Sequence, residues 1–327
     1  MLSRRQALSL LTATASVPLL GSRASAQTYP ARPIKLVVPF PPGGVNDTVG
    51  RPWAEKMREP LGSIVIENVG GAGGGVGSAA VARAAPDGYT LLLAPEATLL
   101  VTPISSKHPT YDWKSYEPVA SLVKSAVGFV AHPSAPFRTL QELAALAKSK
   151  SANLSYVTPG VGTSNHLVVE LFKSLIGAPD LQHVPYRGAG PALNDLIGGQ
   201  VQLGTVVVTG HVLELHRAKR LHLFAVSSPA RLQAAPDVPT AAEEGFPSLV
   251  WVGFHGIFAP AKTSSAIVNR LAEASHAAMA DKGLQKFFLD SGLEPELEST
   301  PEGVRRTLAE EVERWTPVIK GLGLQVD

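Results

Sequence analysis

The chain has 327 residues, with 29 Lys and Arg against 27 Asp and Glu, a formal charge of +2 and no cysteine. The missing cysteines exclude disulfides, thiol nucleophiles and thiolate metal ligands, and the lack of a basic cluster argues against nucleic acid or an anionic membrane as partner. With those partners disfavoured, we expect a small-molecule ligand, and without disulfides we expect stability to come from buried apolar surface. Chains above about 250 residues tend to divide into domains, so we also expect two lobes.

The N-terminal segment predicts an export signal. Arg4 and Arg5 precede an apolar, small-residue stretch over 7–20, and Ala24-Ser25-Ala26 has the form of a cleavage site. A membrane anchor is the alternative, but a spanning helix needs ~20 strongly apolar residues and this stretch is shorter and interrupted by hydroxyl residues and a proline. We predict a signal peptide over 1–26 and a periplasmic protein whose mature chain has 26 basic and 27 acidic side chains. The arginine pair fits the twin-arginine route and also an ordinary secretory signal.

Short β-rich apolar runs alternate with helical patterns along the chain, which is the signature of βαβ units in a parallel sheet covered on both faces. The fold class is therefore predicted to be α/β. The predicted strands are Ile34–Val38, Ile64–Glu67, Thr90–Ala94, Val119–Val123, Val127–Ala131, Leu154–Val157, Val201–Val208, Leu221–Val226 and Val252–Phe258.

No Ser/Gly linker interrupts this pattern, so two lobes would have to be joined by strands that cross between them. The natural candidates lie within 119–131 and 221–258. This predicts a discontinuous first domain, 27–125 with 246–327, and a second domain, 126–245.

Three helix starts can be located from capping residues. Thr139 with Glu142, and Thr240 with Glu243, form the S/T-x-x-E capping box, and Thr300 is followed by proline at the first helical position. We interpret these caps as architecture and not as chemistry.

The first predicted strand runs into a loop that contains Phe40, Pro41, Pro42, Gly43 and Gly44. Prolines preset the backbone and glycines let N–H groups turn toward a ligand at the N-terminus of the next helix, so an anion fits there without a cationic side chain. The alternative is a rigid turn. In the helix that follows, Asp47 and Arg51 are spaced for an ordinary i,i+4 ion pair, which we favour over a ligand role for them.

A glycine run over 70–77 follows the second predicted strand and suggests a dinucleotide site. Gly75 to Ala80 matches G-x-G-x-x-A, but the acidic residue expected ~20 positions further on is missing, and Asp87 comes too early. No Lys-Ser/Thr follows the glycines, as a P-loop would require. Close packing of a helix on a strand explains the glycines better, so we predict no cofactor.

Hydroxyl residues gather at the start of a third predicted helix. Thr158 follows a strand, Gly162 comes after it, and Thr163 and Ser164 open the helix, where their O–H groups, the backbone N–H groups and the helix dipole could cradle a carboxylate. The alternative is a plain N-cap. A single His one turn into a helix, such as His166, is more often a packed or capping residue than a ligand contact.

Catalytic constellations are missing from the sequence. There is neither a G-x-S-x-G elbow nor H-E-x-x-H, and His211 and His216 lie five apart and so point to different faces of a helix. We therefore predict no metal site and no enzyme.

Several motifs coincide with those of a known family, over essentially all of the chain from Tyr29. They are Tyr29-Pro-Ala-Arg-Pro-Ile34, Pro39–Gly44 with Asp47 and Arg51, Glu67-Asn68 with the glycine run, Pro86–Thr90, Val184–Gly188 with Pro191–Leu193, Gly198–Val201, Arg231, and Pro236–Thr240 with Glu244-Gly245. With these motifs the chain resembles the Bug-type receptors of tripartite tricarboxylate transporters. The resemblance implies a two-lobed, Venus-flytrap fold of the type II periplasmic-binding-protein kind, with a ligand cleft between the lobes.

The resemblance also implies that the first loop and the helix opening at Gly162–Ser164 pinch the ligand, with contacts from Pro95–Thr98 and Thr205–Val207. Many relatives carry an Asp near the position of Val206, where this chain has Val206-Val207-Val208. Because a carboxylate is the usual partner for a ligand ammonium, its absence puts an amino-acid ligand in doubt. Glu96 would replace that acid only if it faces the cleft. The predicted ligand-binding residues are Phe40, Pro41, Pro42, Gly43, Gly44, Glu96, Ala97, Thr98, Thr158, Gly162, Thr163, Ser164, His166 and Val206.

The predicted function is capture of a small organic or aromatic carboxylate in the periplasm and delivery to the membrane permease subunits of such a transporter, by a protein expected to be a monomer. Two alternatives stay open. One is a ligand-sensing receptor that docks a signalling partner, and the other is an enzyme that uses the glycine-rich loops for a phosphate or nucleotide.

Overall fold

The computed structural model describes residues 29–149 and 154–324, so the predicted signal peptide lies outside the described residues. The strands are β1 (Ile34–Val38), β2 (Ile64–Asn68), β3 (Thr90–Pro95), β4 (Tyr116–Ala131), β5 (Ser155–Thr158), β6 (Gln182–Pro185), β7 (Leu203–Val207), β8 (His222–Val226), β9 (Val252–Pro260) and β10 (Glu294–Pro295). The helices are α1 (Val45–Lys56), α2 (Arg58–Leu61), α3 (Gly75–Ala82), α4 (Glu96–Ser105), α5 (Leu140–Lys148), α6 (Ser164–Ile176), α7 (Ala189–Ile197), α8 (Gly210–Arg217), α9 (Ser265–Met279), α10 (Lys282–Asp290) and α11 (Pro301–Gly321), with short 3-10 turns η1 (Ala72–Gly74) and η2 (Trp113–Ser115).

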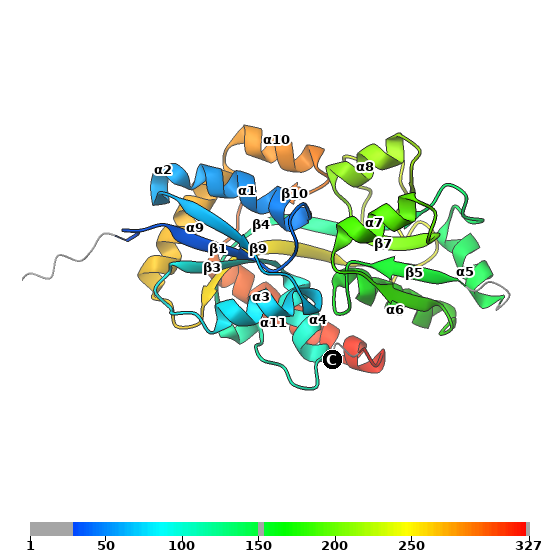
Figure 1. The fold of residues 1–327 in the computed structure, drawn as a ribbon, viewed down its shortest axis with the longest axis horizontal. Helices are drawn as coiled ribbons and strands as arrows, with labels where there is room; N and C mark the ends of the chain where they lie inside the picture. The colour runs from blue at the N-terminus through cyan, green and yellow to red at the C-terminus, as the bar shows by residue number, and fades with distance from the viewer. Residues whose placement is uncertain (1–28, 150–153, 325–327) are drawn as a thin grey trace, which may run out of the picture.

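The strands form two groups that share one long strand, and helices cover the groups as two lobes (Figure 1). In the first lobe β1 pairs in parallel with β2 and β3, and β9 joins antiparallel to β3. In the second lobe β5 pairs in parallel with β6 and β7. This confirms the predicted α/β class with parallel βαβ units.

Strand β4 crosses between the lobes. Residues 116–126 pair with β9, and residues 127–131 pair with β7 and β8. The sequence predicted two strands here, 119–123 and 127–131. They are one continuous strand because Lys124 is the only exposed residue of β4, so the polar residues between the two apolar runs do not interrupt the sheet.

Two other elements differ from the prediction. Strand β6 was not predicted, because its four residues are mostly exposed at the edge of the sheet and show no apolar alternation. Thr240 and Glu243 do exchange the two hydrogen bonds of a capping box, 3.1 and 2.8 Å long, but the chain continues as a turn and not as a helix. Gly245, at φ +88°, follows at once and leaves the right-handed helical region.

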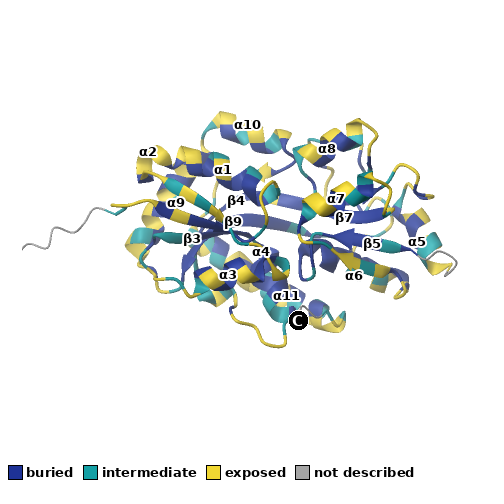
Figure 2. Ribbon diagram, in the orientation of Figure 1, coloured by how far each residue is buried: buried dark blue, intermediate teal, exposed yellow. Residues whose placement is uncertain are grey.

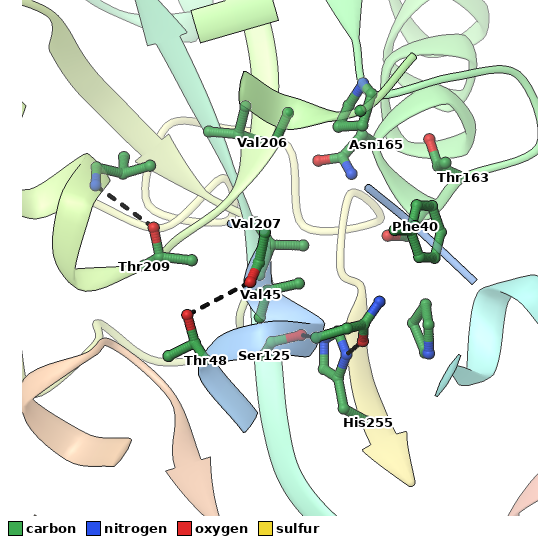
Figure 3. A pocket seen from close by; sticks show the side chains of 18 of the residues that line it. Phe40, Val45, Thr48, Ser125, Thr163, Asn165, Val206, Val207, Thr209 and His255 are labelled. Atoms are coloured by element: carbon green, nitrogen blue, oxygen red, sulfur yellow. Dashed lines mark hydrogen bonds between the residues drawn. The ribbon is translucent and has the colours of Figure 1, made fainter. Parts of the chain in front are cut away.

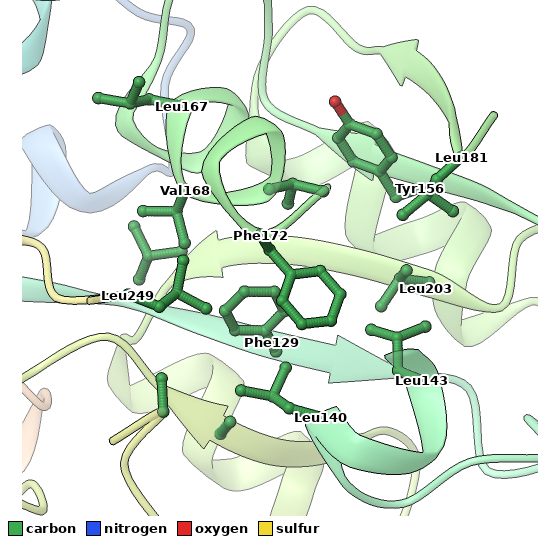
Figure 4. Packing of buried hydrophobic residues seen from close by; sticks show 14 of the residues in the cluster. Phe129, Leu140, Leu143, Tyr156, Leu167, Val168, Phe172, Leu181, Leu203 and Leu249 are labelled. Carbon is green, nitrogen blue, oxygen red and sulfur yellow. The ribbon is translucent and has the colours of Figure 1, made fainter. Parts of the chain in front are cut away.

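Apolar burial holds each lobe together. The strands are buried between helices whose outer faces are exposed (Figure 2). In the second lobe Phe129 on β4 packs against Phe172 on α6, with ring centroids 5.8 Å apart (Figure 4). Trp315 and Ile319 near the C-terminal end of α11 belong to this same cluster, so α11 packs against both lobes. Among the described residues, no helix is long and apolar enough to cross a membrane.

Candidate functional site

A cavity of about 400 Å³ lies between the two lobes (Figure 3). A volume of this order suits a small organic ligand. Its walls are formed by residues within 40–48, 95–98, 125–127, 159–165, 187–194, 206–212 and 251–255, together with Phe287 and Ser291. Apolar side chains line the larger part, and polar groups project between them.

Five helices begin at the cavity. Their N-cap residues Gly44 (α1), Pro95 (α4), Thr163 (α6), Gly188 (α7) and Thr209 (α8) all line it. The threonine side chains cap α6 and α8, whereas α1, α4 and α7 have no side-chain cap. The first N–H groups of an uncapped helix are open to a ligand, and each helix N-terminus carries a fractional positive charge. The helix dipoles therefore add positive potential at the cavity, where Arg187 is the only Lys or Arg among the described residues that line it.

Side chains of α1 and β2 hold the first loop in place. The Asp47 carboxylate accepts a hydrogen bond from the backbone N–H of Gly43 and pairs with Arg51 at 3.1 Å. Asn68 Nδ2 donates to the carbonyl oxygen of Phe40 at 2.9 Å. Asp47 and Arg51 therefore form the structural pair that the sequence favoured, and they fix the backbone of the loop against the cavity.

Thr163 and Ser164 behave differently at the start of α6. The Thr163 hydroxyl donates to the carbonyl oxygen of Gly160 at 2.8 Å and accepts from the N–H of His166 at 3.4 Å. Both of its hydrogen-bonding roles are thus occupied by an N-cap. Ser164 lines the cavity, and its hydroxyl has no hydrogen-bond partner among the described residues. The next residue, Asn165, also lines the cavity, with a buried and unpaired Oδ1.

A stack of rings supports this loop from behind. His166 Nδ1 accepts from the N–H of Gly162 at 3.3 Å, and its ring stacks on His183 with centroids 4.1 Å apart. His183 stacks in turn on Tyr156, and its Nε2 lies 2.7 Å from the hydroxyl of Thr158. Burial lowers the pKa of His166 to about 4 and, with His166 beside it, the pKa of His183 to about 3. Both imidazoles are therefore neutral near pH 7.

A third buried imidazole, that of His255, joins three distant segments at the cavity wall. His255 Nδ1 lies 2.7 Å from Asn46 Oδ1, and its Nε2 lies 3.1 Å from Ser125 Oγ. Because the amide oxygen of Asn46 only accepts, Nδ1 carries the proton and Nε2 accepts from the serine. Burial lowers the pKa of His255 to about 4. The sequence did not predict these hydrogen bonds, because no sequence pattern links positions 46, 125 and 255.

The glycine run brings the two lobes into contact. A methyl group on Gly73 would lie 2.3 Å from the carbonyl oxygen of Val161 in the other lobe, so only glycine permits this approach. Beside it, Thr102 Oγ1 donates to the carbonyl oxygen of Gly162 at 3.4 Å. Gly77 packs closely on Pro39 and Val69, as the helix-on-strand interpretation expected. The contact between the lobes was not foreseen.

Most of the predicted site residues meet at one place. Those that line the cavity are Phe40, Pro41, Pro42, Gly43, Gly44, Glu96, Ala97, Thr98, Thr163, Ser164 and Val206. Thr158, Gly162 and His166 do not line it; they belong to the layer that supports α6. The walls contributed by 187–194, 209–212 and 251–255 are additional to the prediction, and the glycine that precedes α7 is a signal that could have located the first of them.

Comparisons with known proteins agree on one family. A family model described as tripartite tricarboxylate transporter family receptor matches residues 49–324. The chain is 35% identical over 306 residues to protein BugT of Bordetella pertussis, covering 92% of this chain and 93% of that protein. The solved structure of periplasmic binding protein BugD is similar with a TM-score of 0.84 and 33% identity over 91% of this chain and 99% of that one. MatC from Rhodopseudomonas palustris, solved with bound malate, is similar with a TM-score of 0.84 and 31% identity over 89% and 100%.

The buried histidines predict how stability depends on pH. Because the pKa of His166 is about 4 in the folded chain and about 6.5 when unfolded, the unfolded state binds an extra proton between these values, and the free energy of unfolding falls as pH drops from 6.5 to 4. His166→Phe should reduce this slope by up to ~1.4 kcal/mol per pH unit. Urea denaturation at several pH values measures it, with the exposed His276→Phe as control. Equal slopes in wild type and His166→Phe would contradict the assignment.

Proposed function

The chain belongs to the tripartite tricarboxylate transporter receptor family, whose members are solute-binding receptors, and we propose that it captures a small organic carboxylate in its cavity and delivers it to a membrane permease. The observation that carries this proposal is the convergence of five helix N-termini on one cavity with a single Lys or Arg among its described lining residues. Such a site attracts an anion through backbone dipoles, which suits a carboxylate that must later be released.

The carboxylate would be held by N–H groups and one hydroxyl. The uncapped helices α1 and α7 offer their first N–H groups, and the free hydroxyl of Ser164 adds a donor from α6. The similar MatC was solved with malate, which supports a small carboxylate as the ligand class. Phe40, Val206 and Trp251 would contact the carbon skeleton of the ligand.

Closure of the lobes completes the capture. Two contacts join the lobes beside the cavity. One is between Gly73 and Val161. The other is between Pro41 and Gly188, where a methyl group on the glycine would lie 3.6 Å from the proline ring. Crossing strand β4 provides the connection about which such lobes can move. We propose the predicted domain bounds, 27–125 with 246–327 and 126–245, on the same grounds. A permease would recognise the closed state of the receptor, although a signalling partner could recognise that state equally well.

An enzymatic role is the second candidate, because Ser125, His255 and Asn46 form a serine–histidine–amide chain at the cavity. A general base works best with a pKa near the working pH, whereas that of His255 is about 4. The neutral Asn46 also gives less support to an imidazolium than a carboxylate would. We therefore propose that the hydrogen bonds between Ser125, His255 and Asn46 position α1 against β4 and β9. We also propose that the protein is not an enzyme.

We propose export to the periplasm with removal of residues 1–26, on the basis of the arginine pair, the apolar stretch and Ala24-Ser25-Ala26. N-terminal sequencing of protein from the periplasmic fraction should give a first residue at or near Gln27. Full-length protein that stays in the membrane fraction would contradict the proposal.

Ser164 tests the carboxylate site. Ser164→Ala should weaken binding of a cognate carboxylate by ~10-fold or more, since hydrogen bonds to charged groups contribute ~1.5–3 kcal/mol and ~1.4 kcal/mol is one decade in Kd. Thr163→Ala is the neighbouring control: it removes a cap, so it should cost ~1 kcal/mol of stability and affect binding less. Calorimetric titration and thermal melting separate the two. Wild-type affinity in Ser164→Ala would mean that backbone N–H groups hold the anion without this hydroxyl.

Gly73 tests lobe closure. Gly73→Ala places a methyl group against Val161 and should hold the lobes apart, weakening binding by ~10-fold or more without removing any donor. Gly177→Ala is a matched control, because Gly177 has nearly the same backbone angles (φ 65°, ψ 37° against φ 60°, ψ 24°) and nothing within 4 Å of the added methyl. Both variants should lose similar stability, but only Gly73→Ala should lose affinity. Equal affinities would show that this contact is not needed for capture.

A further inference from the structure

Arg187 places an unpaired positive charge at the mouth of the cavity. The lining residues that are exposed to solvent mark this mouth, and among those that the structure describes they are Pro41, Pro42, Gly43, Arg187, Gly190, Pro191, Asn194, His211 and Phe287. Arg187 is the only Lys or Arg in this set, and the set contains no Asp or Glu. The Arg187 side chain has neither a hydrogen bond nor an ion pair with any described residue, so its charge is free to act on an incoming ligand.

The backbone on both sides of Arg187 is fixed. Arg187 lies between β6 and α7. The N–H of Tyr186 donates to the carbonyl oxygen of Thr158 at 3.0 Å, and the N–H of Gly188 donates to that of Pro159 at 2.9 Å. Both acceptors belong to the segment that runs from the end of β5 toward α6. The loop is therefore anchored within the second lobe, while the Arg187 side chain stays exposed.

This loop also meets the first lobe. Gly188 is buried, and a methyl group on it would lie 3.6 Å from the ring of Pro41. The Arg187 charge thus stands beside the point where the second lobe meets the first loop, which runs into the uncapped N-terminus of α1. Gly188 is itself the N-cap residue of α7, which has no side-chain cap either. A ligand that enters at this mouth would pass the guanidinium before it reaches the N–H groups of α1 and α7.

Helix N-termini do not attract a ligand from a distance, because their partial charges act within about the first turn. The predicted mature chain has nearly equal numbers of basic and acidic side chains, so its net charge adds no long-range attraction for an anion. An arginine keeps its charge throughout the physiological pH range, and an exposed charge acts over the Debye length, about 8 Å at an ionic strength of about 0.15 M. Among the described lining residues, attraction of an anion from solution therefore falls to Arg187.

We propose that Arg187 steers the anionic ligand to the mouth and so raises the rate of association, whereas the N–H groups inside the cavity hold the ligand once it is bound. The inference rests on the proposed carboxylate-capture function. A charge at the rim of a site acts mainly on the association rate and its salt dependence, whereas a desolvated contact acts mainly on the dissociation rate. Arg187 is exposed, and an exposed ion pair contributes little to the stability of a bound state.

The association and dissociation rate constants of variants test this assignment. Malate, adipate and benzoate are the probes, and the one that wild type binds most tightly in calorimetry is followed by stopped-flow tryptophan fluorescence, since Trp251 lines the cavity. Arg187→Gln should slow association ~3-fold or more at an ionic strength of about 0.01 M and have little effect at about 1 M, because the Debye length shrinks from about 30 Å to about 3 Å. Its dissociation rate should stay within about twofold of wild type.

Two further substitutions separate charge from shape. Arg187→Lys keeps the charge and should associate at nearly the wild-type rate. Arg187→Glu should slow association ~10-fold or more at an ionic strength of about 0.01 M, and added salt should speed it up, because salt then screens a repulsion. Arg220→Gln is the matched control and should show wild-type rates: Arg220 is an exposed arginine of the same lobe, without a side-chain partner among the described residues, beyond the end of α8 that is remote from the cavity.

Equal association rates of Arg187→Gln and Arg220→Gln at low ionic strength would overturn the inference alone. So would faster dissociation of Arg187→Gln that persists at about 1 M salt, because it would place Arg187 in contact with the bound ligand. If wild type binds none of the probes in calorimetry, the proposed function fails first and the inference with it, so the two failures are distinguishable.

Discussion

The proposed capture depends on placing an anion between two lobes without a cluster of cationic side chains. Helix N-termini are the alternative source of positive potential, and their partial charges act only over the first turn, so several must point at one place. Parallel βαβ units provide this, because each helix begins where a strand ends and neighbouring strands end at the same edge. Here α1 and α4 follow β1 and β3 in the first lobe, and α6, α7 and α8 follow β5, β6 and β7 in the second. The cavity lies where these two edges meet.

The joining elements make this arrangement compatible with movement. Strand β4 runs unbroken from one lobe to the other, whereas its pairing with β9 contains irregularities near 118–120 and 121–123. Helix α11 packs against both lobes, through Val304 and Leu308 at one end and Trp315 at the other. In the proposed closure, a hinge built from a continuous strand and a bridging helix would limit the relative motion of the lobes to a few directions. The contact at Gly73 would then set how far the lobes close, because a carbonyl oxygen meets a residue that has no side chain.

The parts of the fold and of the candidate site that could be predicted were those set by residues close together in the sequence. The strands that precede the loops, the first loop itself and the opening of α6 were located correctly, because apolar runs and Pro/Gly pairs act within a few residues. The role of Thr163 could not be decided, since a capping hydroxyl and a ligand-binding hydroxyl look alike in sequence, and only its bond to the Gly160 carbonyl distinguishes them. The contact between Asn46, Ser125 and His255 was out of reach, because it joins α1, β4 and β9 across the fold.

The buried titratable groups around the cavity share one property, which follows from how the site produces its charge. His166, His183 and His255 are all held neutral by burial near pH 7, so the imidazoles around the cavity contribute no charge to it. The field of the cavity then comes chiefly from backbone dipoles, which do not titrate. A receptor built in this way keeps its attraction for an anion across a wide pH range and leaves selectivity to neutral donors at the walls. Under the proposed function, a few hydrogen-bonding side chains, rather than net charge, would therefore decide which ligand this chain binds.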